Sequence, residues 1–127
     1  MKLAATQRVF KTARFSKDAK KGSIADIELC EAIAQVLAGQ ADDLGGGVFK
    51  KRLNSNIYRA IILAKGGAYW VYEYLFAKKD QGNIQADELA GFRMLAKGYA
   101  ALTSAQLNRL LTDKDLTEIC HDHQAKV

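Results

Sequence analysis

The spacing of apolar residues changes along the chain, and each change predicts a different kind of element. Apolar residues recur at helical spacing from Ile24 to Leu37, which predicts an amphipathic helix of about four turns. From residue 48 to residue 77 the period falls to two, and β-branched and aromatic residues dominate. This pattern predicts strands at 48–53, 57–65 and 68–77, joined by short turns into an antiparallel meander.

The segments before the meander are shorter. Residues 7–11 predict a strand, and the basic segment that follows predicts a turn or short helix ending near Gly22. Residues 42–47 end in three consecutive glycines, which adopt positive φ without strain. We therefore expect a loop there.

Helical spacing returns after Asn83, a candidate N-cap, and Thr103 with Gln106 forms a capping-box pattern that predicts a further helix. The polar end of the chain is expected to fray from about residue 113. The prediction is thus one α+β domain over residues 1–127, in which a small antiparallel sheet is flanked by helices, with added helices near the C-terminus.

Composition narrows the class of protein. With 127 residues, 49% apolar and 26% charged, the chain suits a single folded soluble domain. It contains no apolar run of the roughly 18 residues that a membrane helix needs, and its first residues lack a signal-peptide core, so we expect a cytoplasmic protein without membrane contact. Cys30 and Cys120 lie far apart in the sequence, which favours reduced cysteines and excludes a disulfide scaffold; Cys30 is expected to pack in its helix.

The formal net charge of +5 is distributed in blocks. Residues 1–22 carry seven basic residues against Asp18, residues 23–45 carry five acidic and no basic residues, and residues 46–80 carry seven basic against two acidic residues. If the two basic blocks meet in the fold, they form a face that attracts a phosphate backbone, with the acidic block on another side. Solvated lysines on an ordinary surface are the alternative.

The meander contains the candidate binding residues. Alternation along the first strand puts Lys50 and Arg52 on one face, and Phe49 and Leu53 on the other, in the core. Arg59 is the one charge near the start of the next strand, where it either forms an ion pair or contacts a phosphate.

The third strand carries an aromatic series. Trp70, Tyr72, Tyr74, Phe76 and Lys78 share one parity, which predicts a ladder that is mostly buried. At the end of this strand, Lys78 and Lys79 can reach a ligand while staying exposed.

A metal site is not expected. The stretch Cys120-His121-Asp122-His123 has ligand residue types, but a polar tail provides no scaffold for tetrahedral geometry. The P-loop, GxGxxG, HExxH, CxxC and GxSxG motifs are absent. We therefore expect neither metal nor other cofactor, and any catalysis must rest on Lys, Arg and Tyr.

Three stretches in order resemble a known toxin family. They are Asp43-Leu44-Gly45-Gly46-Gly47-Val48-Phe49-Lys50-Lys51-Arg52, Tyr58-Arg59-Ala60-Ile61-Ile62-Leu63, and Tyr74-Leu75-Phe76-Ala77-Lys78-Lys79-Asp80-Gln81-Gly82-Asn83-Ile84. The similarity is to the HigB-type branch of the RelE/ParE superfamily, toxins of type II toxin–antitoxin modules, and spans about residues 8–112. It implies a RelE-like toxin fold. The chain departs from the family pattern at Leu75, where glycine is common.

The resemblance also implies an activity and a set of residues. The activity is that of an endoribonuclease that cleaves mRNA, in many members on the ribosome. Because RNA carries its own nucleophile, the 2′-hydroxyl, we expect this cleavage to need no metal. The catalytic positions fall on Lys50, Arg52, Arg59, Tyr74 and Lys78. Beside them, RNA binding is expected at Lys51, Tyr58 and Lys79.

The implied partners are a cognate antitoxin of the helix-turn-helix type, mRNA and the ribosome, with operator DNA reached only through the antitoxin complex. Three alternatives stay open. The same charge pattern would suit a non-catalytic basic binding protein or a ParE-like toxin that inhibits gyrase, and a remnant with a structural role is the third.

Overall fold

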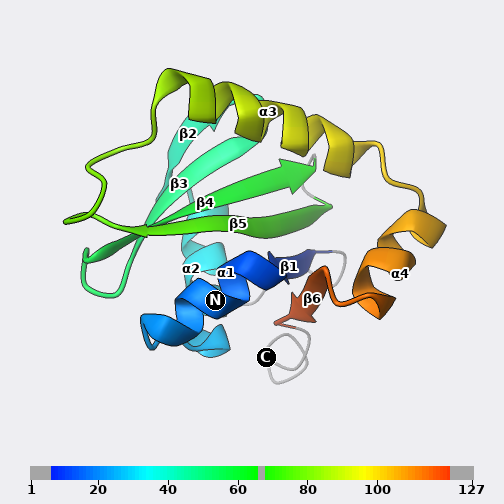
Figure 1. Cartoon of the computed structure of the whole chain (residues 1–127), viewed down its shortest axis with the longest axis horizontal. Coiled ribbons are helices and arrows are strands. Elements are labelled where there is room, and N and C mark those ends of the chain that lie inside the picture. The colour runs from blue at the N-terminus through cyan, green and yellow to red at the C-terminus, as the bar shows by residue number, and fades with distance from the viewer. Residues whose placement is uncertain (1–6, 66–67, 121–127) are drawn as a thin grey trace.

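The protein consists of a six-stranded sheet with helices on both faces (Figure 1). The structure, a computed structural model, describes residues 7–65 and 68–120. The strand order is β2-β3-β4-β5-β1-β6. The elements are β1 (Arg8–Thr12), α1 (Ala13–Lys21), α2 (Asp26–Leu37), β2 (Asp42–Gly45), β3 (Val48–Leu53), β4 (Tyr58–Lys65), β5 (Tyr69–Ala77), α3 (Ala86–Ala100), α4 (Ser104–Thr112) and β6 (Leu116–Ile119).

The predicted meander is confirmed, and the sheet extends beyond it. Strands β3, β4 and β5 pair antiparallel within one residue of the predicted bounds. The loop expected at 42–47 is partly wrong, because β2 pairs there with β3 before the glycine turn. At that turn Gly45, Gly46 and Gly47 have φ of 83°, 66° and 82°, as their lack of a side chain allows. The sheet is mixed, since β1 runs parallel to β5.

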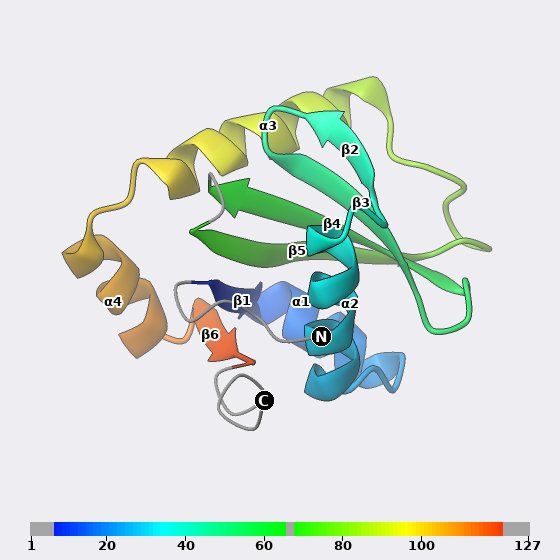
Figure 2. The same cartoon turned by 180° about the vertical axis from the view of Figure 1, so that it is seen from behind.

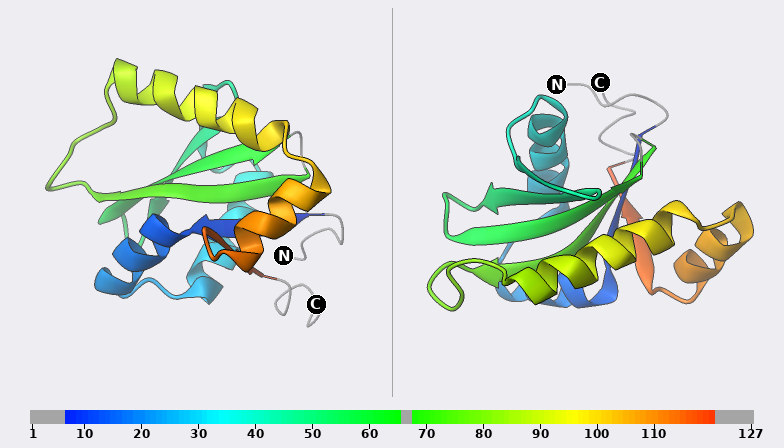
Figure 3. Two further views of the ribbon diagram at one scale, coloured as in Figure 1. Left: turned by 45° about the vertical axis from the view of Figure 1, so that its right-hand side comes forward. Right: turned by 90° about the horizontal axis from the view of Figure 1, so that it is seen from above.

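Each face of the sheet packs against its own helices. One face, with Ala60, Ile62 and Tyr72, packs against apolar residues of α1 and α2. The other, with Val48, Ile61 and Val71, packs against α3 and α4. Figure 2, the view from behind, shows α2 in front of the sheet, and the view from above in Figure 3 shows the sheet between α2 and α3. The α+β prediction is therefore confirmed.

A β-bulge at Glu73 divides the predicted aromatic ladder between the two faces of the sheet, although Trp70, Tyr72 and Phe76 are buried as predicted. Ile61 pairs with Tyr74 whereas Ile62 pairs with Tyr72, so Glu73 is the extra residue of β5. Trp70 and Tyr72 consequently lie in the core under α1 and α2, while Tyr74 and Phe76 lie on the α3 side. Strict alternation fails because one inserted residue reverses the faces that follow.

Helix starts follow local chemistry. At α4 the predicted capping box is present: Thr103 Oγ1 accepts from the Gln106 N–H at 3.1 Å, and the Thr103 N–H donates to Gln106 Oε1 at 2.9 Å. The N-cap predicted at Asn83 is wrong. Helix α3 begins at Ala86 after Gln85, whose N–H donates to Glu88 Oε1 at 2.8 Å.

Two expectations about the C-terminal part of the chain are wrong. The chain does not fray from residue 113 to residue 120, because β6 pairs antiparallel with β1. The cysteines are also paired, in a disulfide between Cys30 of α2 and Cys120. Their sequence separation of 90 residues gave no sign of this, since β6 returns to the sheet edge next to α2 only in the folded chain.

Candidate functional site

Four of the predicted catalytic residues share one face of the sheet. Arg52 on β3 lies directly opposite Arg59 on β4. One row further along, Lys50 on β3 pairs with Ile61, which in turn pairs with Tyr74 on β5. Residues paired across neighbouring strands point to the same side of a sheet. Lys50, Arg52, Arg59 and Tyr74 therefore form one surface on the α3 side, here called the basic strand face.

Arg59 lies at the buried edge of this face, with only 7% of its surface exposed. Its Nη1 donates to the carbonyl oxygens of Asn56 at 2.9 Å and Tyr58 at 3.3 Å. Asn54, Ser55 and Asn56 form the β3–β4 turn with positive φ, and the Asn56 carbonyl of this turn faces the guanidinium. Among the described residues, no carboxylate forms an ion pair with Arg59 or Arg52. Two arginines thus face each other without a neutralising acid.

The two lysines of the predicted set have different surroundings. Lys50 Nζ donates to Asn83 Oδ1 at 3.2 Å and lies 3.6 Å from Asp42 Oδ2. Lys78 is exposed just after β5, where its backbone N–H donates to the Ile57 carbonyl at 2.9 Å. This bond keeps Lys78 beside the β3–β4 turn, next to the end of the basic strand face.

The charge pattern predicted that the acidic block, residues 23–45, lies on a separate side of the protein. This prediction is wrong. Asp42 lies beside Lys50 because β2 pairs with β3 in a register that places the two opposite each other. Asp26, at the start of α2, forms an ion pair with Lys11 of β1, with Oδ1 and Nζ 2.7 Å apart. Acidic residues of the second block therefore offset part of the charge of both basic blocks.

Tyr74 is held in a definite orientation. Its hydroxyl donates to Gln81 Oε1 at 2.9 Å, and its ring lies 5.6 Å from the ring of Phe76 and 5.8 Å from that of Phe92. The guanidinium carbon of Arg14 lies 4.6 Å from the centre of the Tyr74 ring. Such a cation over an aromatic face is attractive. Tyr74 thus links the basic strand face to α1.

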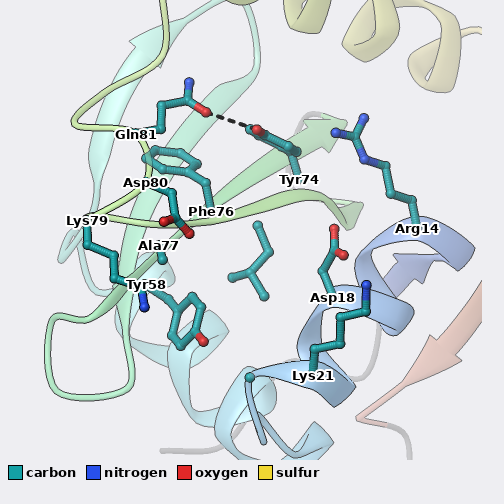
Figure 4. Close-up of a pocket in the computed structure, with 12 residues that line it drawn as sticks. Arg14, Asp18, Lys21, Tyr58, Tyr74, Phe76, Ala77, Lys79, Asp80 and Gln81 are labelled. Atoms are coloured by element: carbon teal, nitrogen blue, oxygen red, sulfur yellow. Dashed lines mark hydrogen bonds between the residues drawn. The ribbon is translucent and has the colours of Figure 1, made fainter.

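Beyond Tyr74 lies a cavity of about 440 Å³ between α1 and the end of β5, here called the α1–β5 pocket (Figure 4). It brings together Tyr58 and Lys79, two predicted RNA-binding residues, although they are 21 positions apart in the sequence. The pocket is also lined by Arg14, Asp18 and Lys21 of α1 and by Asp80 and Gln81. The α1 residues were missed, although their spacing of four and three positions puts them on one helix face.

The third predicted RNA-binding residue, Lys51, is separate from this pocket. It lines a smaller cavity of about 370 Å³ between β3 and the segment before β2, together with Lys50 and Arg52. Burial, and then the charge of Arg52, lower the pKa of Lys51. Seven of the eight predicted residues are thus distributed over the basic strand face and these two cavities, and Lys78 lies beside the β3–β4 turn.

A half-buried acid, Glu73, lies next to Tyr99 of α3. Burial raises the pKa of Glu73, an effect that the hydrogen bond from Tyr99 and the charge of Arg14 partly offset. The Tyr99 hydroxyl donates to Glu73 Oε1 at 3.1 Å, and burial followed by the Glu73 charge raises the pKa of Tyr99. This pair connects the bulge of β5 to α3.

No group of three or more potential metal ligands lies together within residues 7–65 and 68–120. Of the Cys120–His123 stretch, only Cys120 lies inside these ranges, and its sulfur is bonded to Cys30. In the same ranges, no helix has the length and apolar composition required to span a bilayer.

Comparison with known proteins identifies the family. A sequence profile described as "RelE toxin of RelE / RelB toxin-antitoxin system" matches residues 7–119. The chain belongs to the RelE toxin family. No curated protein and no solved structure matches it. As a RelE toxin it is the toxin of a toxin–antitoxin system, and its partner is an antitoxin. The match runs from the residue before β1 to the end of β6, so it includes the basic strand face and the α1–β5 pocket.

Proposed function

We propose that this RelE toxin is an endoribonuclease that cleaves mRNA, on the ribosome, without a metal ion. The observation that carries the proposal is the shared face of Lys50, Arg52, Arg59 and Tyr74, on which two arginines lie directly opposite each other. Arginine presents several donors in a planar fork that matches a phosphate. Family membership supports the same activity.

The chemistry uses a nucleophile that RNA itself carries. The 2′-hydroxyl oxygen loses its proton and attacks the adjacent phosphorus, the bond from phosphorus to the 5′-oxygen breaks, and the leaving oxygen takes up a proton. The products are a 2′,3′-cyclic phosphate and a 5′-hydroxyl. Positioned protein side chains suffice for this reaction, because it needs only proton transfer and stabilisation of the pentacovalent phosphate.

We assign the roles from the surroundings of each residue. Arg52 and Arg59 stabilise the additional negative charge of the phosphate. Arg59 Nη1 donates to the Asn56 and Tyr58 carbonyls, which holds this guanidinium in place opposite Arg52. Lys78 or Lys50 transfers the proton, and Tyr74 orients the base. Lys51, Tyr58 and Lys79 bind flanking parts of the RNA.

The finer assignments of partner and place belong to the same proposal. We place the protein in the HigB-type branch, with a helix-turn-helix antitoxin through which alone it reaches operator DNA. We place it in the cytoplasm, where mRNA and ribosomes are. Isolation of the antitoxin complex and sequencing of the bound partner test the first two assignments.

A cleavage assay tests the activity. Purified protein is incubated with end-labelled mRNA, with and without ribosomes. Arg52→Gln is expected to lower the cleavage rate about 100-fold or more, since removing one donor to a developing oxyanion has effects of that size. Arg109→Gln is the matched control, because Arg109 is exposed on α4 and pairs only with Asp113 among the described residues. Arg59→Lys tests the second arginine with its positive charge retained.

The outcomes separate the alternatives. Cleavage that Arg52→Gln abolishes and Arg109→Gln leaves intact supports the ribonuclease. Intact RNA together with inhibited gyrase supercoiling would overturn it in favour of a ParE-like toxin. Intact RNA with salt-sensitive nucleic-acid binding would favour a non-catalytic binding protein. The absence of RNA cleavage, gyrase inhibition and nucleic-acid binding together would favour a structural role.

A further inference from the structure

The α1–β5 pocket combines aromatic rings with cations. Tyr74 and Tyr58 contribute rings from two strands, and Arg14, Lys21 and Lys79 contribute positive charge from α1 and from the segment after β5. Figure 4 shows Lys21 and Asp18 on α1, opposite Tyr58 and Lys79 across the pocket. Rings on which a base can stack, next to cations that can hold a phosphate, are the features of sites for single-stranded nucleic acid.

The size and position of the pocket also suit a nucleotide. Its volume of about 440 Å³ lies within the range of sites for small ligands. Tyr74 belongs both to this pocket and to the basic strand face, so the two places meet at this residue.

We propose that the α1–β5 pocket binds one nucleotide of a single-stranded RNA, next to the nucleotide held on the basic strand face. The base lies against the Tyr58 ring, next to the Arg14 guanidinium that covers the Tyr74 ring. Its phosphate lies between Lys21 and Lys79. This inference rests on the proposed function for the identity of the ligand. It adds Arg14 and Lys21 as binding residues and gives α1 a role in recognising the substrate.

The two carboxylates of the pocket restrict which base fits. Asp18 and Asp80 line it together with the amide of Gln81, whose Oε1 already accepts from Tyr74. Ionised carboxylates only accept hydrogen bonds, and the exocyclic amino group of adenine or cytosine is a suitable donor. The pocket therefore favours a base with an exocyclic amino group over uracil.

The test measures binding separately from cleavage. The probe is a short single-stranded RNA with 2′-O-methyl groups, which cannot be cleaved because the nucleophile is blocked. Lys21→Ala is expected to weaken binding by about threefold to tenfold. Lys20→Ala is the matched control, since Lys20 is an exposed neighbour on the same helix that does not line the pocket.

A second variant tests the pocket without changing its charge. A Cβ on Gly22 would lie 2.9 Å from Cζ of Tyr58, so Gly22→Ala displaces this ring. It is expected to weaken binding of the probe and to leave binding of an abasic strand of equal length unchanged. Amide chemical-shift changes on adding the probe are expected in residues 14–22 and 74–81. Replacing adenine or cytosine by uracil throughout the probe should weaken binding, and Asp80→Asn should reduce that preference.

Several outcomes would overturn the pocket assignment. One is that Lys20→Ala and Lys21→Ala weaken binding of the probe equally. The others are that abasic and complete strands bind equally well, and that the chemical-shift changes are confined to β3 and β4. None of these concerns cleavage. A wild-type protein that cleaves mRNA but gives these results keeps the proposed function and loses the pocket, whereas one that binds the probe in the pocket but leaves RNA intact does the reverse.

Discussion

The two faces of the central sheet differ in the residues that β3, β4 and β5 place on them. On the α2 side, Ala60, Ile62, Trp70 and Tyr72 form a buried apolar layer. On the α3 side, the same strands carry apolar residues at one end and the basic strand face at the other.

This difference separates folding from function within one sheet. The α2 side also carries the Cys30–Cys120 disulfide and the hydrogen bond from the Tyr72 hydroxyl to the Leu29 carbonyl at 2.6 Å. Strands anchored on one side by such contacts can hold charged residues in a fixed register on the other. Two adjacent arginines repel each other, and the α2 side offsets that cost.

Breaking the disulfide should have the largest effect on stability. It closes a loop of 90 residues, for which chain entropy predicts a contribution of about 4 kcal/mol. Thermal unfolding with and without a thiol reductant measures it, and reduction should lower the melting temperature by about 15 °C. The double variant Cys30→Ser/Cys120→Ser is the control, because the reductant should not affect it. Equal melting temperatures for oxidised and reduced wild type would contradict the conclusion that contacts on the α2 side stabilise the fold.

Ile33→Ala should have the next largest effect. Ile33 is fully buried in α2, and its truncation leaves a cavity that costs about 3 kcal/mol. Denaturant unfolding measures the loss in the free energy of unfolding. At denaturant concentrations well below the unfolding midpoint, the cleavage rate of the variant should stay close to that of the wild type. Arg52→Gln should show the reverse, with unfolding near wild type because Arg52 is exposed. If Ile33→Ala and Arg52→Gln each reduce both stability and cleavage, the two faces of the sheet do not have separate roles in folding and in function.

Glu73→Gln should have the smallest effect on stability. Burial raises the pKa of Glu73 in the folded protein above its value in the unfolded chain. The free energy of unfolding therefore falls as the pH rises through the folded pKa. The amide removes this penalty, so the variant should be more stable at about pH 7, by under about 1 kcal/mol after allowance for solvent screening. The gain should vanish below about pH 4, where Glu73 is protonated in both states.

Denaturant unfolding at the two pH values checks this prediction. Glu31→Gln is the control, since Glu31 is exposed on α2. A variant less stable than wild type at about pH 7 would show that the contact with Tyr99 outweighs the cost of burial.

Much of the fold could be predicted, because local periodicity reports which residues are buried. The bounds of β3, the capping box at Thr103 and the helix that contains Ile33 follow from apolar spacing and side-chain chemistry within a few residues. The shared face of Lys50 and Arg52 follows from alternation alone. The bulge at Glu73 did not follow, because an inserted residue leaves the composition of a strand unchanged.

The candidate site was predictable only in part for a similar reason. Lys50, Arg52 and Arg59 lie in strands whose pairing could be deduced, so their common face was predictable. Tyr74 joins that face only through the bulge at Glu73, which was not. Arg14 and Lys21 were missed because their helix packs beside β5 only after β1 has entered the sheet parallel to that strand.

The sequence by itself determined the kinds of elements, their order and the charged residues that the strands present, since these depend on neighbours within a few positions. Only the tertiary structure decided that Cys30 meets Cys120, that Asp42 lies beside Lys50 and that α1 closes a pocket over Tyr74. Such contacts join residues far apart in the chain, and they form only when the whole sheet has brought its edges and helices together.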